Sequence, residues 1–226
     1  MTKSIAGKVC AFLLAGILGA CATEGDSSGG SGFLRDYPRL RQTKTAEGNT
    51  IRGWVSPKLT PSTFVAVLLD PLVFYPEPRP TEHVSEETLR QILAYANDAL
   101  KRSLSQQFRV VDRAAPGVLR IRSAFTGVGA HGEGLQPYQY IPIAFAATMA
   151  SRAATGTPQR AFIVVEVEGS DSVTGELLAM RARVETGERL AKVAEQNVIT
   201  LEAVKPLLDQ LAAGAFPELA KYVKPK

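Results

Sequence analysis

The chain has 226 residues, of which 45% are hydrophobic and 21% are charged, so it is long and apolar enough to bury a core. Its 26 Lys and Arg exceed its 22 Asp and Glu and give a formal net charge of +4, but Lys3 and Lys8 lie in the first twenty residues. Without those two lysines the charge is +2, which favours no polyanion, and we expect no nucleic-acid partner.

The first twenty residues have the order of a secretory signal. Residues 1–8 are basic and contain no acid, and residues 9–20 are apolar or small. This apolar stretch is too short to span a bilayer, which takes roughly 20 residues. We therefore expect residues 1–20 to be a cleaved signal peptide. A short buried helix, or an ordinary signal followed by a chance cysteine, is the alternative.

The signal ends in Leu18-Gly19-Ala20-Cys21, which resembles the lipobox of bacterial lipoprotein precursors. The resemblance implies cleavage before Cys21, a diacylglycerol on its thiol and a further acyl chain such as palmitate on its amine. Two or three acyl chains hold a protein stably on a membrane, whereas one binds only marginally. Ala22 stands where Asp favours inner-membrane retention in enteric lipoproteins, so the resemblance implies the outer membrane, facing the periplasm.

A flexible tether follows the lipidated cysteine. Residues 22–32 are rich in Gly and Ser and have no means to bury apolar surface, so we expect residues 21–32 to link the anchor to a single domain at 33–226. Cys10 leaves with the signal and Cys21 carries lipid, so the domain has no disulfide.

The first part of the domain, residues 33–61, is expected to be irregular, with a short strand at Trp54 and Val55. The β-branched, apolar run at 63–75 predicts a strand that Asp70-Pro71 interrupts. Because proline lacks a backbone N–H, this is an edge strand or a strand with a bulge.

Ser85 is the expected N-cap of a helix that continues to about residue 106. Its apolar residues fall at helical spacing and form one stripe; they are Leu89, Ile92, Leu93, Ala96, Leu100 and Leu104. A short strand at 108–111 and a half-buried strand at 118–125 follow.

Two further runs predict an antiparallel hairpin. Residues 160–168 are the strongest strand in the chain, and residues 177–185 are its expected partner. Between them, Asp171 can accept hydrogen bonds from its own turn, and Gly175 can adopt a positive φ. Thr200 is then expected to cap a last long helix, followed by a turn at 217–223.

This order of elements predicts an α+β fold, a mixed α/β sandwich. We expect one mixed, largely antiparallel sheet with two main helices packed on a single face.

Three stretches of the mature chain resemble the bacterial lipoproteins of the domain-of-unknown-function family 3313 (DUF3313). They are Ser31 to Tyr37 after the tether, Leu69 to Val73 in the first strand, and Asp171 to Ala179 in the hairpin. The resemblance covers nearly the whole mature chain. It implies an envelope lipoprotein without an established activity and supplies no catalytic residues.

The motif Gly127-Val128-Gly129-Ala130-His131-Gly132 has the GxGxxG pattern of a dinucleotide-binding turn. Such a turn opens a helix, yet Gly134, Pro137 and Pro142 follow, so we interpret the motif as a flexible loop and expect no cofactor.

Metal binding and hydrolysis have equally thin support. The chain has two histidines, His83 and His131, and Glu133 beside His131 gives a pair without a third ligand, so we expect no metal. No GxSxG elbow is present, so a cryptic hydrolase is the least favoured function.

Two groups of residues are candidates for contact with a partner. Residues 141–154 are apolar and rich in small side chains, and form either a short helix over the core or an adhesive patch that presents Ile141, Ile143, Phe145 and Met149. Arg120 with Arg122, and Arg181 with Arg183, project from strand faces. If their strands are neighbours, the four side chains share one surface; otherwise they pair with local acids such as Glu166, Glu168 and Glu185.

The sequence therefore predicts a non-catalytic envelope lipoprotein. It is held on the membrane by acyl chains on Cys21 and binds a protein partner. A lipid- or glycan-contacting module with an arginine-rich sheet face is the alternative.

Overall fold

The computed structural model describes residues 30–44, 50–80, 84–132, 159–189 and 200–226. They form eight strands, two helices and two 3-10 turns: η1 (Tyr37–Arg39), β1 (Arg41–Lys44), β2 (Thr50–Val55), β3 (Ala66–Leu69), β4 (Val73–Phe74), α1 (Glu86–Gln107), β5 (Val110–Val111), β6 (Val118–Gly132), β7 (Gln159–Asp171), β8 (Leu177–Arg189), α3 (Leu201–Ala213) and η4 (Leu219–Lys221).

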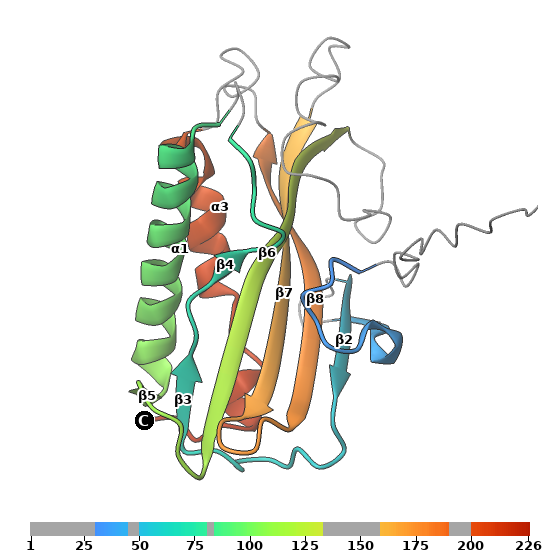
Figure 1. Ribbon diagram of the computed structural model, residues 1–226, viewed down its shortest axis with the longest axis vertical. Helices are drawn as coiled ribbons and strands as arrows, with labels where there is room; N and C mark the ends of the chain where they lie inside the picture. Colours follow the sequence, from blue (N-terminus) through green and yellow to red (C-terminus); the bar gives the residue numbers. More distant parts are fainter. Residues whose placement is uncertain (1–29, 45–49, 81–83, 133–158, 190–199) are drawn as a thin grey trace, which may run out of the picture.

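The strands make one mixed sheet in the order β1-β2-β8-β7-β6-β3-β5, with β4 paired to β6. Along the sheet order β1-β2-β8-β7-β6, each pair of neighbouring strands is antiparallel. In contrast, β3 is parallel to both β5 and β6, and β4 is parallel to β6. Both helices lie on one face of this sheet (Figure 1). The predicted α+β class, with two helices on a single face, is confirmed.

A bulge separates β3 from β4, which follow each other along β6. Ala66 pairs with Val118 and Val73 with Ala124, so the β3–β4 side is one residue longer than the β6 side. Pro71 lies in this break, where no ladder N–H is needed. The bulge predicted from Asp70-Pro71 is confirmed, and β3 has neighbours on both sides, so it is not an edge strand.

Both helices begin at the predicted caps. The Ser85 hydroxyl accepts the N–H of Thr88 at 3.0 Å, and the Thr200 hydroxyl accepts that of Ala203 at 3.3 Å. Five residues of the expected stripe on α1 are buried, whereas Leu93 is half-buried. Among the described residues, neither helix combines the length and apolar character that crossing a bilayer takes.

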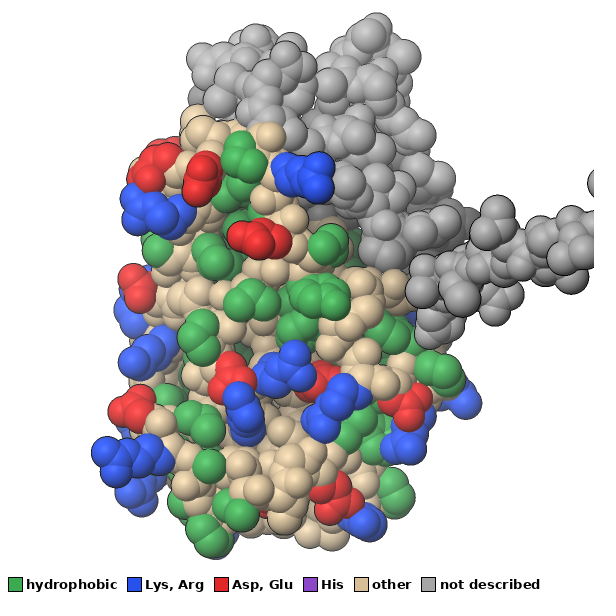
Figure 2. Space-filling view, in the orientation of Figure 1, with side chains coloured by type: hydrophobic (Ala, Val, Ile, Leu, Met, Phe, Trp, Pro, Cys, Tyr) green, Lys and Arg blue, Asp and Glu red, His purple; other side chains and the backbone are tan. Residues whose placement is uncertain are grey.

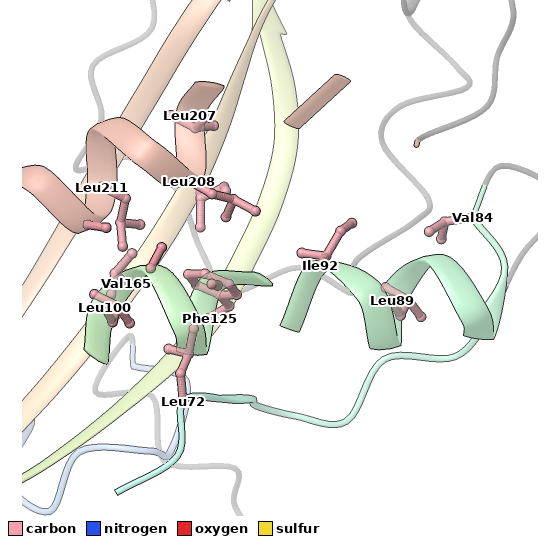
Figure 3. Close-up of a cluster of buried hydrophobic side chains, with 14 residues drawn as sticks. Leu72, Val84, Leu89, Ile92, Leu100, Phe125, Val165, Leu207, Leu208 and Leu211 are labelled. Atoms are coloured by element: carbon pink, nitrogen blue, oxygen red, sulfur yellow. The ribbon is translucent and has the colours of Figure 1, made fainter. Parts of the chain in front are cut away.

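The helices and the sheet enclose the main core. In Figure 3, Leu208 and Leu211 of α3 point towards Leu100 of α1 and Val165 of β7. A second cluster, at the end of α1, surrounds Phe108 and includes Leu104, Val67 and Val223. The chain after η4 is part of this cluster, because Val223 forms a parallel bridge with Phe64.

The predicted hairpin of β7 and β8 is confirmed. Asp171 Oδ1 accepts the N–H groups of Val173 and Thr174 at 2.9 and 2.8 Å, and Gly175 has φ +70°. Ser172 joins this turn to the loop between β5 and β6, since its hydroxyl donates to the Ala115 carbonyl at 3.0 Å.

Replacing Asp171 by alanine is expected to lower the free energy of unfolding by about 1 kcal/mol, because the turn loses its acceptor. The pKa of Asp171 is lowered, first by the Thr174 N–H, so this stabilisation is present above about pH 3.8 and is lost as the pH falls through the folded pKa. Urea unfolding at pH 7 and at pH 3 tests both points. A wild-type-like stability at pH 7 would contradict the role of Asp171.

Two expectations about local structure are wrong. The segment 33–61 was expected to be irregular before Trp54, yet it contains β1, which pairs with β2. The motif at 127–132 was expected to be a flexible loop, yet it continues β6 and pairs with β7, Gly127 opposite Val164. The long antiparallel ladder outweighs the local loop preference of its glycines.

Candidate functional site

The N-terminal arm, residues 30–40, lies on the sheet face opposite the helices (Figure 1). Phe33, Leu34, Tyr37 and Leu40 of the arm are buried and pack against Met180 of β8. Ser31 and Gly32, which were expected to belong to the tether, also make contacts in the folded domain.

Two glutamates of β7 lie beneath the arm. Glu166 and Glu168 are two residues apart on a strand and therefore point to the same face. Their partners on the neighbouring strands, Ala124 and Arg122 of β6, confirm that this is the face away from the helices. Glu166 is 5% exposed and Glu168 is 1% exposed, so both carboxylates need protein partners.

Ser31 and Tyr37 of the arm hold Glu166. The Ser31 and Tyr37 hydroxyls donate to Glu166 Oε2 at 2.7 and 2.6 Å. The Tyr37 oxygen also accepts the N–H groups of Gly32 and Leu34, at 3.0 and 3.1 Å. The Tyr37 hydroxyl therefore holds the turn at the start of the arm and attaches it to β7.

Burial raises the pKa of the Tyr37 phenol, and its hydrogen bond to Glu166 raises it further. The phenol therefore keeps its proton and acts as a donor to the carboxylate. The folded state holds this proton above pH 10, where an unfolded tyrosine loses it, so this contribution to stability falls as the pH rises from about 10 towards the folded pKa.

Two arginines hold Glu168. The backbone N–H and the Nε of Arg35 donate to Oε1 and Oε2 at 2.7 and 3.1 Å, and Arg122 Nη1 donates to Oε2 at 3.1 Å. The Arg122 guanidinium also lies over the ring of Phe33, 4.9 Å from its centroid. Arg35 reaches the hairpin as well, because its Nη1 donates to the Gly175 carbonyl at 3.0 Å.

We call the contacts of Ser31, Arg35 and Tyr37 with Glu166, Glu168 and Arg122 the clasp. The two carboxylates of the clasp accept hydrogen bonds from the arm and from Arg122. Both are therefore occupied in holding a segment of the chain. Gly30 packs beside it, since a Cβ there would lie 2.3 Å from the Tyr37 ring. The clasp can therefore fix the point at which the preceding chain leaves the domain.

Replacing Tyr37 by phenylalanine is expected to cost about 2 kcal/mol of stability, because Glu166 loses a donor and two amides of the arm lose their acceptor. The variant is also expected to lose less stability between pH 9 and pH 11 than the wild type does. Urea unfolding across this pH range measures both effects, and Tyr75→Phe, at an exposed side chain, is the control. Identical pH dependence in Tyr37→Phe and the wild type would contradict the assignment.

The four candidate arginines lie on opposite faces of the sheet. Arg122 is opposite Glu168, whereas Arg181 and Arg183 of β8 are opposite Val167 and Val165, on the helix face. β7 also separates their strands. They therefore do not form one arginine-rich face, because faces follow the strand order and register, which local patterns do not contain.

Three of these arginines are paired with local acids, as expected for strands that are not neighbours. Arg120 pairs with Asp70 at 2.8 Å, and Arg122 pairs with Glu168. Arg183 pairs with Glu185 at 3.0 Å and donates to the carbonyls of Leu211 and Gly214 at the end of α3.

Burial lowers the pKa of Arg183, and the charge of Glu185 opposes this shift. Its side chain is held between β8 and the end of α3, where its charge suits the helix dipole. Arg183 thus fastens a helix to the sheet.

The other candidate residues give no assembled site. Cys21, His83, Glu133 and the apolar residues of 141–154 lie outside the described residues. His131 is on β6, paired with Arg160. In the part of the chain that the structure describes, no three His, Cys, Asp or Glu side chains gather as metal ligands would.

The sequence contained one signal for the clasp. Glu166 and Glu168 alternate with valines inside the most apolar strand, and charged residues at such positions are rarely buried without a partner. The local pattern did not reveal that the partner is the segment from Ser31 to Tyr37, more than a hundred residues earlier.

Comparison with known proteins places this domain in a family. Residues 30–215 match the model of the family described as "Protein of unknown function (DUF3313)". The chain is 30% identical over 185 residues to the uncharacterised lipoprotein YdcL of Escherichia coli K12, and the match covers 82% of each chain.

Two solved structures are distant neighbours. The PelC dodecamer from Paraburkholderia phytofirmans (space group P6) has a TM-score of 0.32 and 14% identity, over 74% of this chain and 94% of that one. A putative neuraminyllactose-binding hemagglutinin homologue from Helicobacter pylori has a TM-score of 0.35 and 10% identity, over 74% and 87%. Likeness this distant carries no functional information. The extent of the family match is decisive: the chain belongs to the DUF3313 family.

Proposed function

We propose that this protein is an envelope lipoprotein, anchored through acyl chains on Cys21, whose domain is a non-catalytic module that binds a protein partner. The lipobox-like Leu18–Cys21 and the lipoprotein relative in E. coli support the anchor. The Ala at position 22 favours the outer membrane, with the domain in the periplasm.

The clasp is the observation that carries this proposal. The chain ahead of Gly30 runs towards the proposed anchor, and the first residues after it are bound to the middle of the sheet through Glu166 and Glu168. This attachment suits an accessory module, because it holds the arm and the sheet together as one rigid unit at the end of the tether. The buried titratable groups Tyr37, Glu166 and Glu168 are engaged in this attachment, which favours binding over catalysis.

The anchor is tested by intact mass. We expect the membrane-extracted protein to begin at Cys21 and to carry the mass of a diacylglycerol and a further acyl chain. The Cys21→Ser variant is expected to lack both and to leave the membrane fraction. An unmodified Cys21 in the wild type would remove the anchor from the proposal.

Partner binding is tested by photo-crosslinking in cells. A photoreactive residue replaces Phe145, in the segment 141–154 that we propose as one docking surface, and in a matched control it replaces Gln42, exposed on β1. A discrete heavier species is expected with position 145 and not with position 42. Identical patterns from the two positions would contradict this docking surface.

A further inference from the structure

On the described surface, exposed cations without an ion pair gather near one end of α1. Elsewhere several cations meet carboxylates, as Lys58 meets Glu176 at 2.7 Å and Arg120 meets Asp70 at 2.8 Å, and unpaired ones such as Lys44 and Arg79 lie on separate segments. Within the described ranges, six exposed cations have no carboxylate within ion-pair distance and lie near the end of α1. These six residues, the basic corner, are Lys101, Arg102, Arg109, Arg113, Lys224 and Lys226.

The fold brings the basic corner together from three segments. Lys226 lies against α1, because its N–H donates to the Gln107 carbonyl at 3.0 Å and its Nζ donates to the Ser105 carbonyl at 2.8 Å. Lys101 and Arg102 are one helical turn before Ser105 and therefore lie on the same side of the helix as Ser105. Arg109 follows at once and begins the turn into the edge strand β5.

Hydrogen bonding to the helix end does not account for this concentration of charge. Among the six cations, Lys226 donates to a carbonyl of α1, and no described bond joins the other five to the helix end. Asp98, one helical turn before Lys101 and Arg102, and Asp112, next to Arg113 in the chain, offset a third of the charge. Like charges this close repel each other, so an anion that binds here relieves a cost of folding.

The basic corner lies away from the arm. Figure 1 places β5 and the C-terminus beside the lower end of α1, whereas the arm is across the sheet, and Figure 2 shows Lys and Arg side chains gathered at this lower corner. The basic corner is therefore open to a partner that approaches the side of the domain away from the arm.

We propose that the basic corner is a docking surface for an acidic segment of a protein partner. The proposal rests on the partner-binding function above and names the chemistry of the partner. A run of Asp and Glu side chains suits it, because several exposed carboxylates can reach cations that are spread over a helix end, a strand start and a chain end. Such complementarity raises the association rate and depends on salt.

The test uses the full mature chain, residues 21–226, with Cys21→Ser so that no acyl chain fixes its orientation. The probe is a fluorescein-labelled decaglutamate peptide, followed by anisotropy at low salt. Lys101→Glu with Arg102→Glu is expected to weaken binding about tenfold. The matched control, Lys44→Glu with Arg79→Glu, reverses two exposed cations elsewhere and is expected to change binding less than twofold.

Urea unfolding of both double variants verifies that they remain folded. Equal loss of binding in the two variants would overturn the proposal, because it would show a response to net charge alone, and so would an absence of peptide binding at low salt. Flotation with phosphatidylglycerol vesicles is the second arm. Vesicle binding that depends on Lys101 and Arg102 without peptide binding would make the occupant a membrane. None of these failures alters the mass of Cys21 or the crosslinks at Phe145.

Discussion

Replacing Glu168 by alanine is expected to lower the free energy of unfolding by about 3 kcal/mol. The side chain is 1% exposed and accepts three bonds, from the Arg35 N–H, the Arg35 side chain and Arg122. Breaking a buried ion pair costs about 3–5 kcal/mol, and the lower end applies because both guanidinium groups reach water and can rehydrate.

Urea unfolding of the mature protein measures this change, and trypsin cleavage after Arg35 or Arg39 reports whether the arm has come free. Glu176→Ala is the control, because its ion pair with Lys58 is exposed and is expected to contribute at most about 0.5 kcal/mol. If Glu168→Ala unfolds at the same urea concentration as Glu176→Ala, the clasp does not stabilise the domain.

Replacing Phe108 by alanine is expected to cost about 4 kcal/mol, the range for removing a fully buried aromatic side chain. Phe108 is 0% exposed and ends α1, where Leu104 and Val223 pack around it. The cavity would separate the end of the helix from the strand-like tail that pairs with Phe64.

Calorimetric or urea unfolding tests this second expectation. Phe108→Leu, which keeps most of the volume, is expected to cost about 1.5 kcal/mol or less. Val173→Ala removes methyl groups from a side chain that is 59% exposed and is expected to change stability by less than about 0.5 kcal/mol. Equal stability of Phe108→Ala and Val173→Ala would contradict this account of the core.

Local chemistry was enough to predict most of the helices and strands. Ser85 and Thr200 begin helices because their hydroxyls satisfy otherwise unpaired N–H groups, and this preference needs no knowledge of the fold. Asp171 and Gly175 predicted the hairpin for the same reason. Pro71 predicted the bulge because a proline cannot donate to a ladder.

Long-range pairing decides which face of the sheet a side chain occupies, and local sequence patterns do not predict it. The face of an arginine on β8 depends on the register with β7, and that register shifts between Gly169 and Ser170, so that no β7 residue stands opposite Leu178. A shift of one residue moves the following side chains to the other face, so Arg181 and Arg183 are on the helix side. The position of the arm could not be predicted for the same reason, because no residue near Tyr37 in the sequence indicates a contact with Glu166.

The attachment of the arm also decides how the domain bears mechanical load. Any pull on the chain ahead of Gly30 passes through Ser31 and Tyr37 into Glu166, and thus into β7, which has hydrogen-bonded strands on both sides. Because the force does not reach the edge strand β1 first, it does not separate β1 from β2 at the edge of the sheet. A force applied through the tether is therefore expected to move the domain as a unit before any strand unfolds.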